Sequence, residues 1–256
     1  MGKIPRYNAL GSTPVSRLPR FLFTAGLVAA SIGAVAQRSR PPSVVLWAWE
    51  RRTDLSFIET KKTGVAYLDA TVTLGTGVSV QPRRQPLRVP PETYLIAVIR
   101  IEARVTDISP ELVPEVVAAL LKSADRSDVK ALQIDFDALQ SQRLFYQQLL
   151  EDLHRQLPPA KGLSITALAS WCAGDNWLTS LPIDEAVPML FRMGPDRALF
   201  EREGLGLIRE TRCAGSVGLS TDEPWPRDLT HRTLYLFNPS GWTRESVAAA
   251  LARARS

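Results

Sequence analysis

Residues 131–138 read Ala-Leu-Gln-Ile-Asp-Phe-Asp-Ala (ALQIDFDA), a mostly apolar run that ends in two aspartates. Its length and its apolar residues predict a buried β-strand. Asp135 and Asp137 are two positions apart, and successive side chains of a strand point to opposite faces. Both carboxylates are therefore expected on one face of this strand.

Seven similar runs surround this one, and helical patterns separate several of them. The runs span residues 44–50, 64–74, 94–103, 163–169, 186–192, 216–220 and 233–237. Helical spacing of apolar residues marks the ranges 110–121, 145–157, 196–203 and 243–251. Together they predict an α/β fold, an irregular (β/α)8 TIM-type barrel in which some helices are short or missing. An open doubly wound sheet of about six strands is the alternative.

The N-terminal residues 1–36 predict a signal peptide. Residues 21–36 are uncharged and mostly apolar, follow Arg17 and Arg20, and end in Ala-Val-Ala, a pattern that signal peptidase accepts. As a helix, this segment spans about 24 Å, which is less than the roughly 30 Å of a membrane core. Cleavage is therefore favoured, and an uncleaved membrane anchor is the alternative.

The predicted organisation is a linker at residues 37–43 and a single barrel domain at residues 44–256. The net charge of +5 is concentrated in the leader, whose four basic and no acidic residues leave 27 basic against 26 acidic residues elsewhere. We therefore expect no nucleic-acid partner, and membrane contact only through an uncleaved N-terminal segment. The expected location is the periplasm or the exterior, or the periplasmic face of a membrane if the anchor remains.

The two cysteines leave their pairing open. Cys172 and Cys213 are able to pair in an oxidising compartment, but their predicted positions lie at opposite ends of the barrel strands. The chain has no cysteine and histidine spacing typical of zinc sites and no glycine-rich phosphate loop. We accordingly expect neither a metal nor a cofactor.

Acidic and basic residues gather at the predicted carboxyl ends of the strands, where TIM-type barrels have their active sites. On the strand at 94–103, Arg100 and Glu102 share one face in the way that the two aspartates do. Close carboxylates repel one another unless one is protonated or paired, and this separates an acid from a base. Catalytic roles are predicted for Asp137, Asp135, Glu102 and Glu223.

Carboxylates flanked by aromatic rings are typical of sites that cleave glycosidic bonds. Substrate-binding roles are predicted for Glu50, Asp69, Arg100, Trp171, Trp177, Arg192 and Trp225. If Glu50 points into the barrel, Trp47 and Trp49 point outward and pack under helices. The structural alternative is that Asp135 and Arg100 form an ion pair without catalytic meaning.

Several runs of this chain resemble a known family. VVLWAWE, LQIDFDA, ITALASWC, DEAVPMLFRMG and SVGLSTDEP resemble an uncharacterised family of secreted bacterial proteins with a domain of unknown function. More distantly, LQIDFDA resembles the motif Asp-x-x-Asp-x-Asp-x-Glu of chitinase-like glycoside hydrolases. Asp135 and Asp137 match its second and third aspartates, whereas Leu132 and Leu139 replace its first aspartate and its catalytic glutamate. The resemblance implies a barrel and a sugar ligand, without the chitinase-like proton donor.

The sequence thus predicts an exported barrel that binds a polysaccharide or oligosaccharide and hydrolyses glycosidic bonds with a carboxylate pair. By analogy with retaining glycosidases, one acid comes from the fourth strand and one from the seventh, which pairs Asp137 with Glu223 or Asp222. Two alternatives remain: a barrel that binds glycans without cleaving them, and an envelope scaffold whose polar interior is structural.

Overall fold

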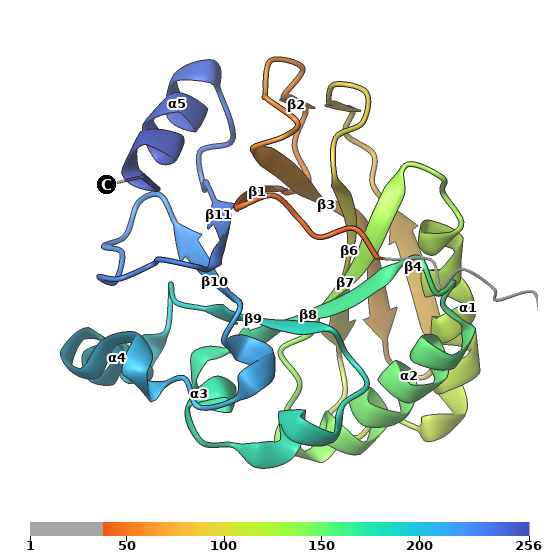
Figure 1. Ribbon diagram of the computed structural model, residues 1–256. Helices are drawn as coiled ribbons and strands as arrows, with labels where there is room; N and C mark the ends of the chain where they lie inside the picture. The colour runs from red at the N-terminus through yellow and green to blue at the C-terminus, as the bar shows by residue number, and fades with distance from the viewer. Residues whose placement is uncertain (1–37, 256) are drawn as a thin grey trace, which may run out of the picture. The chain divides into compact units, whose positions relative to one another are not determined.

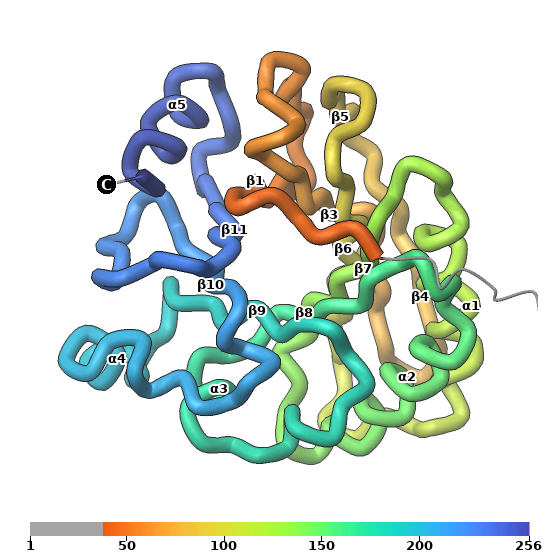
Figure 2. Tube along the Cα trace, in the orientation of Figure 1, coloured from red at the N-terminus to blue at the C-terminus, as the bar shows by residue number. Residues whose placement is uncertain are grey.

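A closed barrel of eight parallel strands forms the core of residues 38–255, the part of the chain that the computed structural model describes (Figure 1). In order around the barrel, the strands are β1 (Val44–Ala48), β3 (Thr63–Leu74), β6 (Leu95–Ala103), β7 (Val129–Asp135), β8 (Gly162–Leu168), β9 (Glu185–Met189), β10 (Ser216–Ser220) and β11 (Thr233–Phe237). The barrel closes because β1 pairs with both β3 and β11, so that Val45 lies between Gly64 and Tyr235. Figure 2 follows the trace around this ring.

All eight predicted barrel strands are present, and the prediction of few helices is confirmed. The α-helices are α1 (Val113–Ala124), α2 (Arg143–Gln156), α3 (Ala169–Ala173), α4 (Arg197–Glu203) and α5 (Arg244–Arg253). Within residues 38–255, no α-helix connects β1 to β3, β3 to β6, or β10 to β11. The architecture is consistent with a TIM-type barrel that has lost helices from these crossovers.

Strand β4 (Val78–Pro82) replaces the missing helix between β3 and β6. It runs antiparallel to the second half of β3, along the edge that β1 leaves when it ends at Ala48. Two short strands, β2 (Thr53–Asp54) and β5 (Leu87–Arg88), form a separate parallel pair near this end of the barrel. The Pro-rich and Arg-rich segment that follows β3 is thus ordered by strand pairing.

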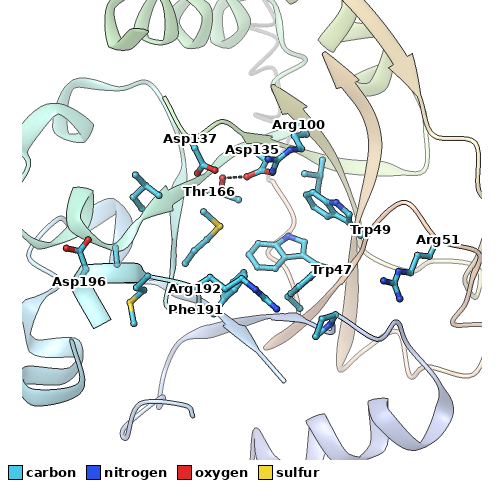
Figure 3. Close-up of a pocket in the computed structure, with 17 residues that line it drawn as sticks. Trp47, Trp49, Arg51, Arg100, Asp135, Asp137, Thr166, Phe191, Arg192 and Asp196 are labelled. Carbon is cyan, nitrogen blue, oxygen red and sulfur yellow. Dashed lines mark hydrogen bonds and ion pairs between the residues drawn. The ribbon is translucent and has the colours of Figure 1, made fainter. Parts of the chain in front are cut away.

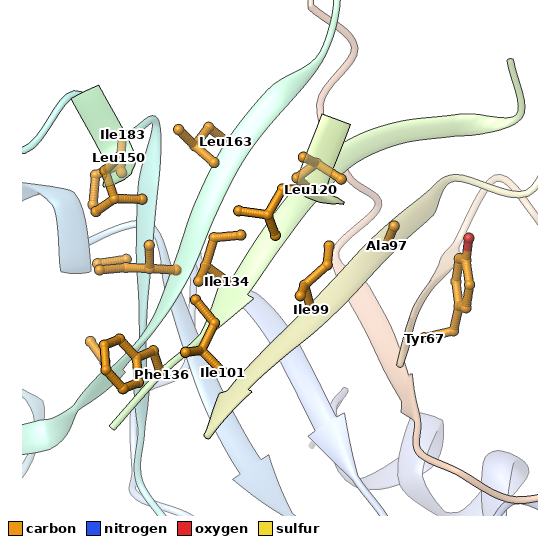
Figure 4. Close-up of a cluster of buried hydrophobic side chains, with 14 of the residues drawn as sticks. Tyr67, Ala97, Ile99, Ile101, Leu120, Ile134, Phe136, Leu150, Leu163 and Ile183 are labelled. Carbon is orange, nitrogen blue, oxygen red and sulfur yellow. The ribbon is translucent and has the colours of Figure 1, made fainter. Parts of the chain in front are cut away.

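Side chains alternate between the barrel interior and its outer face. On β7, Leu132 and Ile134 point outward into the hydrophobic core, which also contains Leu120 of α1 and Leu150 of α2 (Figure 4). Burying a side chain of this size contributes roughly 1.5–3 kcal/mol. The outward side chains of this strand pack against the helices. The inward side chains face the barrel interior, where polar residues are accommodated.

A disulfide joins Cys172 of α3 to Cys213, the last residue of a short 3₁₀ helix (Thr211–Cys213). Their Cα atoms lie 5.9 Å apart. The backbone amides of Arg209 and Glu210 donate hydrogen bonds to the carbonyl of Cys172 over 2.9 and 3.2 Å. The connection from α4 to β10 therefore returns beside α3 and brings together two cysteines that the sequence placed at opposite ends.

The predicted signal peptide, residues 1–36, and Gln37 lie outside the described residues. The rest of the predicted linker packs on the barrel: Arg38 forms an ion pair with Asp184, and the hydroxyl of Tyr94 donates to the carbonyl of Ser39 over 3.0 Å. None of the helices in residues 38–255 has the length and apolar character needed to cross a membrane.

Candidate active site

A cavity of about 760 Å³ opens at the carboxyl ends of the barrel strands (Figure 3). Side chains from β1, β6, β7, β8 and β11, and from the segment that follows β9, line it. Small-molecule sites usually enclose roughly 300–1,000 Å³. The cavity is thus large enough for a ligand of one or a few sugar rings.

Aromatic side chains form one wall and the floor of the cavity. Trp47 and Trp49 of the first strand point inward, next to Phe191 and Phe237. The ring of Trp47 lies edge-on to Phe191 at 6.2 Å, and Phe191 stacks on Phe237 at 5.6 Å. Flat rings of this kind pack against the apolar faces of sugars.

The expectation that Glu50 faces the barrel interior is wrong. Its carboxylate lies outside the cavity and accepts hydrogen bonds from the backbone amides of Arg84 and Gln85, over 3.1 and 3.0 Å. The two tryptophans of β1 take the inward face instead, because inward and outward positions alternate along a strand. Glu50 fixes the connection between β4 and β5 to the end of β1.

Asp135 is held by two partners on neighbouring strands. Its Oδ2 accepts a hydrogen bond from Arg100 Nη1 at 2.9 Å, and its Oδ1 accepts one from the Thr166 hydroxyl at 2.7 Å (Figure 3). Its side chain is 6% exposed. The same arginine donates from Nε to Glu102 at 3.0 Å. The guanidinium and the hydroxyl thus fix both carboxyl oxygens of Asp135 in place.

Asp137 lies beside this network and does not join it. Its side chain points into the cavity and forms no hydrogen bond or ion pair with any residue from 38 to 255. Asp137 is exposed at the mouth of the cavity. Partial desolvation raises its pKa, the negative charge of Asp135 raises it further, and Arg100 opposes the shift. The cavity therefore holds one carboxyl group fixed by two partners and a second one, Asp137, that retains a proton more readily than an ordinary aspartate.

One known protein family matches the part of the chain that supplies most polar residues of this cavity. Residues 92–201 match a DUF3142 domain. Its description is a domain of unknown function. The match contains Arg100, Asp135, Asp137 and Thr166, but neither tryptophan of β1, and it agrees with the uncharacterised family that the sequence resembles. A comparison with curated proteins found no match.

Arg192 follows β9 within the DUF3142 match and also lines the cavity. Its backbone has a φ of 51°, which is uncommon for a residue with a side chain. The carboxylate of Glu223 accepts hydrogen bonds from its backbone amide over 3.2 and 3.3 Å and forms an ion pair with Arg197. The predicted catalytic residue Glu223 thus holds Arg192 in place and is not among the residues that line the cavity.

Two further charged residues line the cavity, and the sequence did not single them out. Asp196 lines it from the short helix before α4, and Arg51 lines it from the segment after β1. Neither side chain has a hydrogen bond or ion pair within the described part of the chain. Each is a charged residue that follows a strand by a few positions, and this is the sequence signal that points to both.

Three tryptophans predicted to contact substrate do not line this cavity. Trp171 and Trp177 pack edge to face at 4.9 Å in the core outside the barrel, with the guanidinium of Arg143 4.9 Å from the Trp177 ring. Trp225 lies under Arg253 at 4.1 Å and donates its indole N–H to the carbonyl of Ser220. The expectation failed because short helices and salt bridges cover the loops that carry these rings.

Asp69 also lies outside the cavity. A register shift between Leu68 and Ala70 forms a bulge at this position, and the carboxylate accepts a hydrogen bond from Ser123 of α1. Arg126 approaches it at 3.8 Å. Asp69 therefore connects β3 to α1 on the outer face of the barrel.

Residues 38–255 contain no cluster of three or more His, Cys, Asp or Glu side chains arranged to hold a metal ion.

Proposed function

We propose that the cavity binds a carbohydrate and that the protein hydrolyses its glycosidic bonds, with Asp137 as the proton donor. The observation that carries the proposal is the pair of unlike carboxyl groups at the end of β7. Asp135 is bound by two partners, whereas desolvation and the charge of Asp135 raise the pKa of Asp137, which has no hydrogen-bond partner in residues 38–255. A raised pKa favours the protonated form that a general acid needs.

Hydrolysis begins when Asp137 transfers its proton to the glycosidic oxygen as the bond from that oxygen to the sugar carbon breaks. A second carboxylate then either takes a proton from the attacking water or attacks the sugar carbon itself. Asp135 is poorly suited to this role because Arg100 and Thr166 occupy both of its oxygens. Asp196 lines the same cavity without a partner, and we assign the second role to it.

The aromatic wall of the cavity favours a sugar, which has apolar faces, over a ligand that is polar on all sides. Trp47, Trp49, Phe191 and Phe237 give the cavity a continuous apolar surface next to the carboxyl groups. The motif resemblance of LQIDFDA to chitinase-like glycoside hydrolases supports the same ligand class. The match to a domain of unknown function neither adds a reaction nor removes one.

One observation favours a second function, glycan binding without cleavage. Leu139, at the position of the chitinase-like catalytic glutamate, is 51% exposed and offers no proton. In that case Asp137 would hydrogen-bond to a sugar hydroxyl.

We further propose that the protein is exported to the periplasm or the exterior. The predicted signal peptide and the Cys172–Cys213 disulfide support this location, because disulfides persist in oxidising compartments. Polysaccharide substrates are also abundant there.

The proposal is tested with the purified full-length protein and a panel of bacterial and plant polysaccharides, by measuring the release of reducing ends. Asp137→Asn is expected to lower turnover by about 10²–10⁴-fold, as loss of a general acid does. Asp107→Asn removes an exposed carboxylate outside the cavity and serves as the control. Binding of a glycan without product would support the second function, and neither binding nor product would contradict both.

A further inference from the structure

Three arginines line the cavity, and the structure uses them differently. Arg100 is occupied by Asp135 and Glu102. Arg51 has no side-chain partner in residues 38–255, and Arg192 has one long contact, 3.4 Å from Nη2 to Asp222. Two guanidinium groups therefore face the cavity with unused hydrogen-bond donors.

The backbone of Arg51 is fixed even though its guanidinium has no partner. Its amide donates to the carbonyl of Trp49 at 2.7 Å, and its carbonyl accepts from Arg83 at 2.5 Å and from the Thr53 hydroxyl at 3.0 Å. The side chain runs past Gly241. Because the backbone is fixed, binding a ligand restricts only the side-chain rotamers of Arg51 and requires no ordering of the loop.

Arg192 is positioned by its backbone and by two rings. Glu223 holds its amide, and its guanidinium lies 5.9 Å from the ring centre of Phe191 and 5.5 Å from that of Phe237. Cation–π contact leaves the N–H groups in the guanidinium plane available, and this planar fork matches the oxygens of a carboxylate or a sulfate. The strained φ of 51° is typical of a residue held for function.

Apart from the Arg100–Asp135 ion pair, the carboxyl groups of the cavity lie away from Arg51 (Figure 3). Trp47 lies between Arg192 and the two aspartates at the end of β7, Asp135 and Asp137. A neutral sugar would leave the unpaired guanidinium of Arg51 and the unused donors of Arg192 without an anionic partner. An anionic substituent would be drawn to the arginines and kept away from the carboxyl groups, and this would orient the glycosidic bond toward Asp137.

We propose that the sugar bound in this cavity is acidic, and that Arg51 and Arg192 bind its anionic substituent, a carboxylate or a sulfate ester. The inference rests on the proposed carbohydrate function and adds the class of substrate. It also gives Glu223 a positioning role through the backbone of Arg192.

The test titrates the full-length protein with matched pairs of glycans and measures dissociation constants calorimetrically at two salt concentrations. The probes are polygalacturonate and alginate, each beside its carboxyl-reduced form, and chondroitin sulfate beside its desulfated form. At least one acidic glycan is expected to bind ten or more times more tightly than its partner, with a smaller difference at high salt. The pair that differs identifies carboxylate or sulfate as the recognised group.

Two variants connect this preference to the arginines. Arg51→Gln and Arg192→Gln are each expected to weaken binding of the acidic glycan about tenfold, as loss of a charge-assisted hydrogen bond does, and to leave the neutral partner within about twofold. Arg52→Gln is the matched control, because Arg52 is exposed, adjacent in sequence and absent from the cavity. Arg51 makes no side-chain contact that folding depends on, so its variant remains informative if Arg192→Gln is unstable.

Equal binding of acidic and neutral glycans would overturn the inference and leave the proposed function standing. An equal effect of Arg52→Gln and Arg51→Gln would do the same, because it would show a general charge effect. Binding of no glycan in the panel would overturn both the inference and the proposed function.

Discussion

Gly218 of β10 leaves the space that the ring of Trp47 from β1 fills. A methyl group at Gly218 would lie 2.9 Å from Cη2 of Trp47 and 3.1 Å from Cζ3. The ring is anchored at its other side, where Nε1 donates to the side-chain oxygen of Gln133 over 2.8 Å. The floor of the cavity therefore depends on one position without a side chain.

Gly218→Ala is expected to destabilise the protein by roughly 2 kcal/mol, as overpacking of a closed interior does. Trp47 must tilt, break its hydrogen bond to Gln133 and enter the cavity above it. Denaturant unfolding measures the first effect, and a change in tryptophan fluorescence reports the second. Gly215→Ala is the control, because no atom lies within 4 Å of the added methyl group. Equal stability of the two variants would contradict the packing account.

Arg83 connects the carboxyl end of β1 to the middle of β3. Its guanidinium donates to the carbonyls of Ala48, Trp49, Leu68 and Arg51, over 3.2, 2.6, 3.3 and 2.5 Å. Arg83→Lys keeps the charge but cannot reach all four oxygens, so we expect a loss of about 2 kcal/mol. Unfolding in urea gives the free energy. Arg84→Lys should lose less than about 0.5 kcal/mol, because no side-chain hydrogen bond of Arg84 to residues 38–255 is present.

The pH dependence of stability tests the state of Asp137. Burial and the charge of Asp135 raise the pKa of Asp137 in the folded protein above its unfolded value, so the folded state binds the proton more tightly. Stability from this group is fully present below the unfolded pKa and is lost as pH rises through the folded pKa. Asp137→Asn is thus expected to be more stable than the unchanged protein at neutral pH.

The measurement is a series of thermal unfolding curves from acid to neutral pH. The advantage of Asp137→Asn should disappear below the ordinary pKa range of aspartate, where both proteins carry an uncharged side chain. Asp107→Asn, at an exposed position, should show no such trend. An advantage that stays constant with pH would mean that Asp137 is not the titrating group.

Alternation along strands made most of the barrel predictable. Eight apolar runs were enough to locate eight strands, and the spacing of Arg100, Asp135 and Asp137 correctly placed them on one face. The same rule failed at β1, because alternation fixes which residues share a face but not which face points inward. The outward position of Trp47 and Trp49 was predicted on the condition that Glu50 points inward, and the structure has the opposite orientation.

The wrong predictions for Trp177 and Asp69 have another cause: both residues contact partners that are distant in the sequence. Trp177 is covered because Arg143, 34 positions earlier, lies over its ring. The bulge at Asp69 turns its carboxylate toward Ser123 of α1. Neither a local sequence pattern nor the composition predicts these contacts. They depend on which crossovers lack helices and on how neighbouring segments pack where those helices are missing.

The disulfide should stabilise the protein through its unfolded state. Cys172 and Cys213 are separated by 41 positions, and closing a loop of this length contributes about 4 kcal/mol in the chain-entropy description. Both residues are fully buried.

The double variant Cys172→Ala/Cys213→Ala is therefore expected to unfold at lower urea concentration and to keep its ligand affinity within about twofold, because neither cysteine lines the cavity. The control is the unchanged protein unfolded in dithiothreitol, which should show the same loss. If the double variant were as stable as the oxidised protein, the cross-link would not contribute to the fold; if it lost ligand affinity as well, α3 would be coupled to the barrel mouth through this bond.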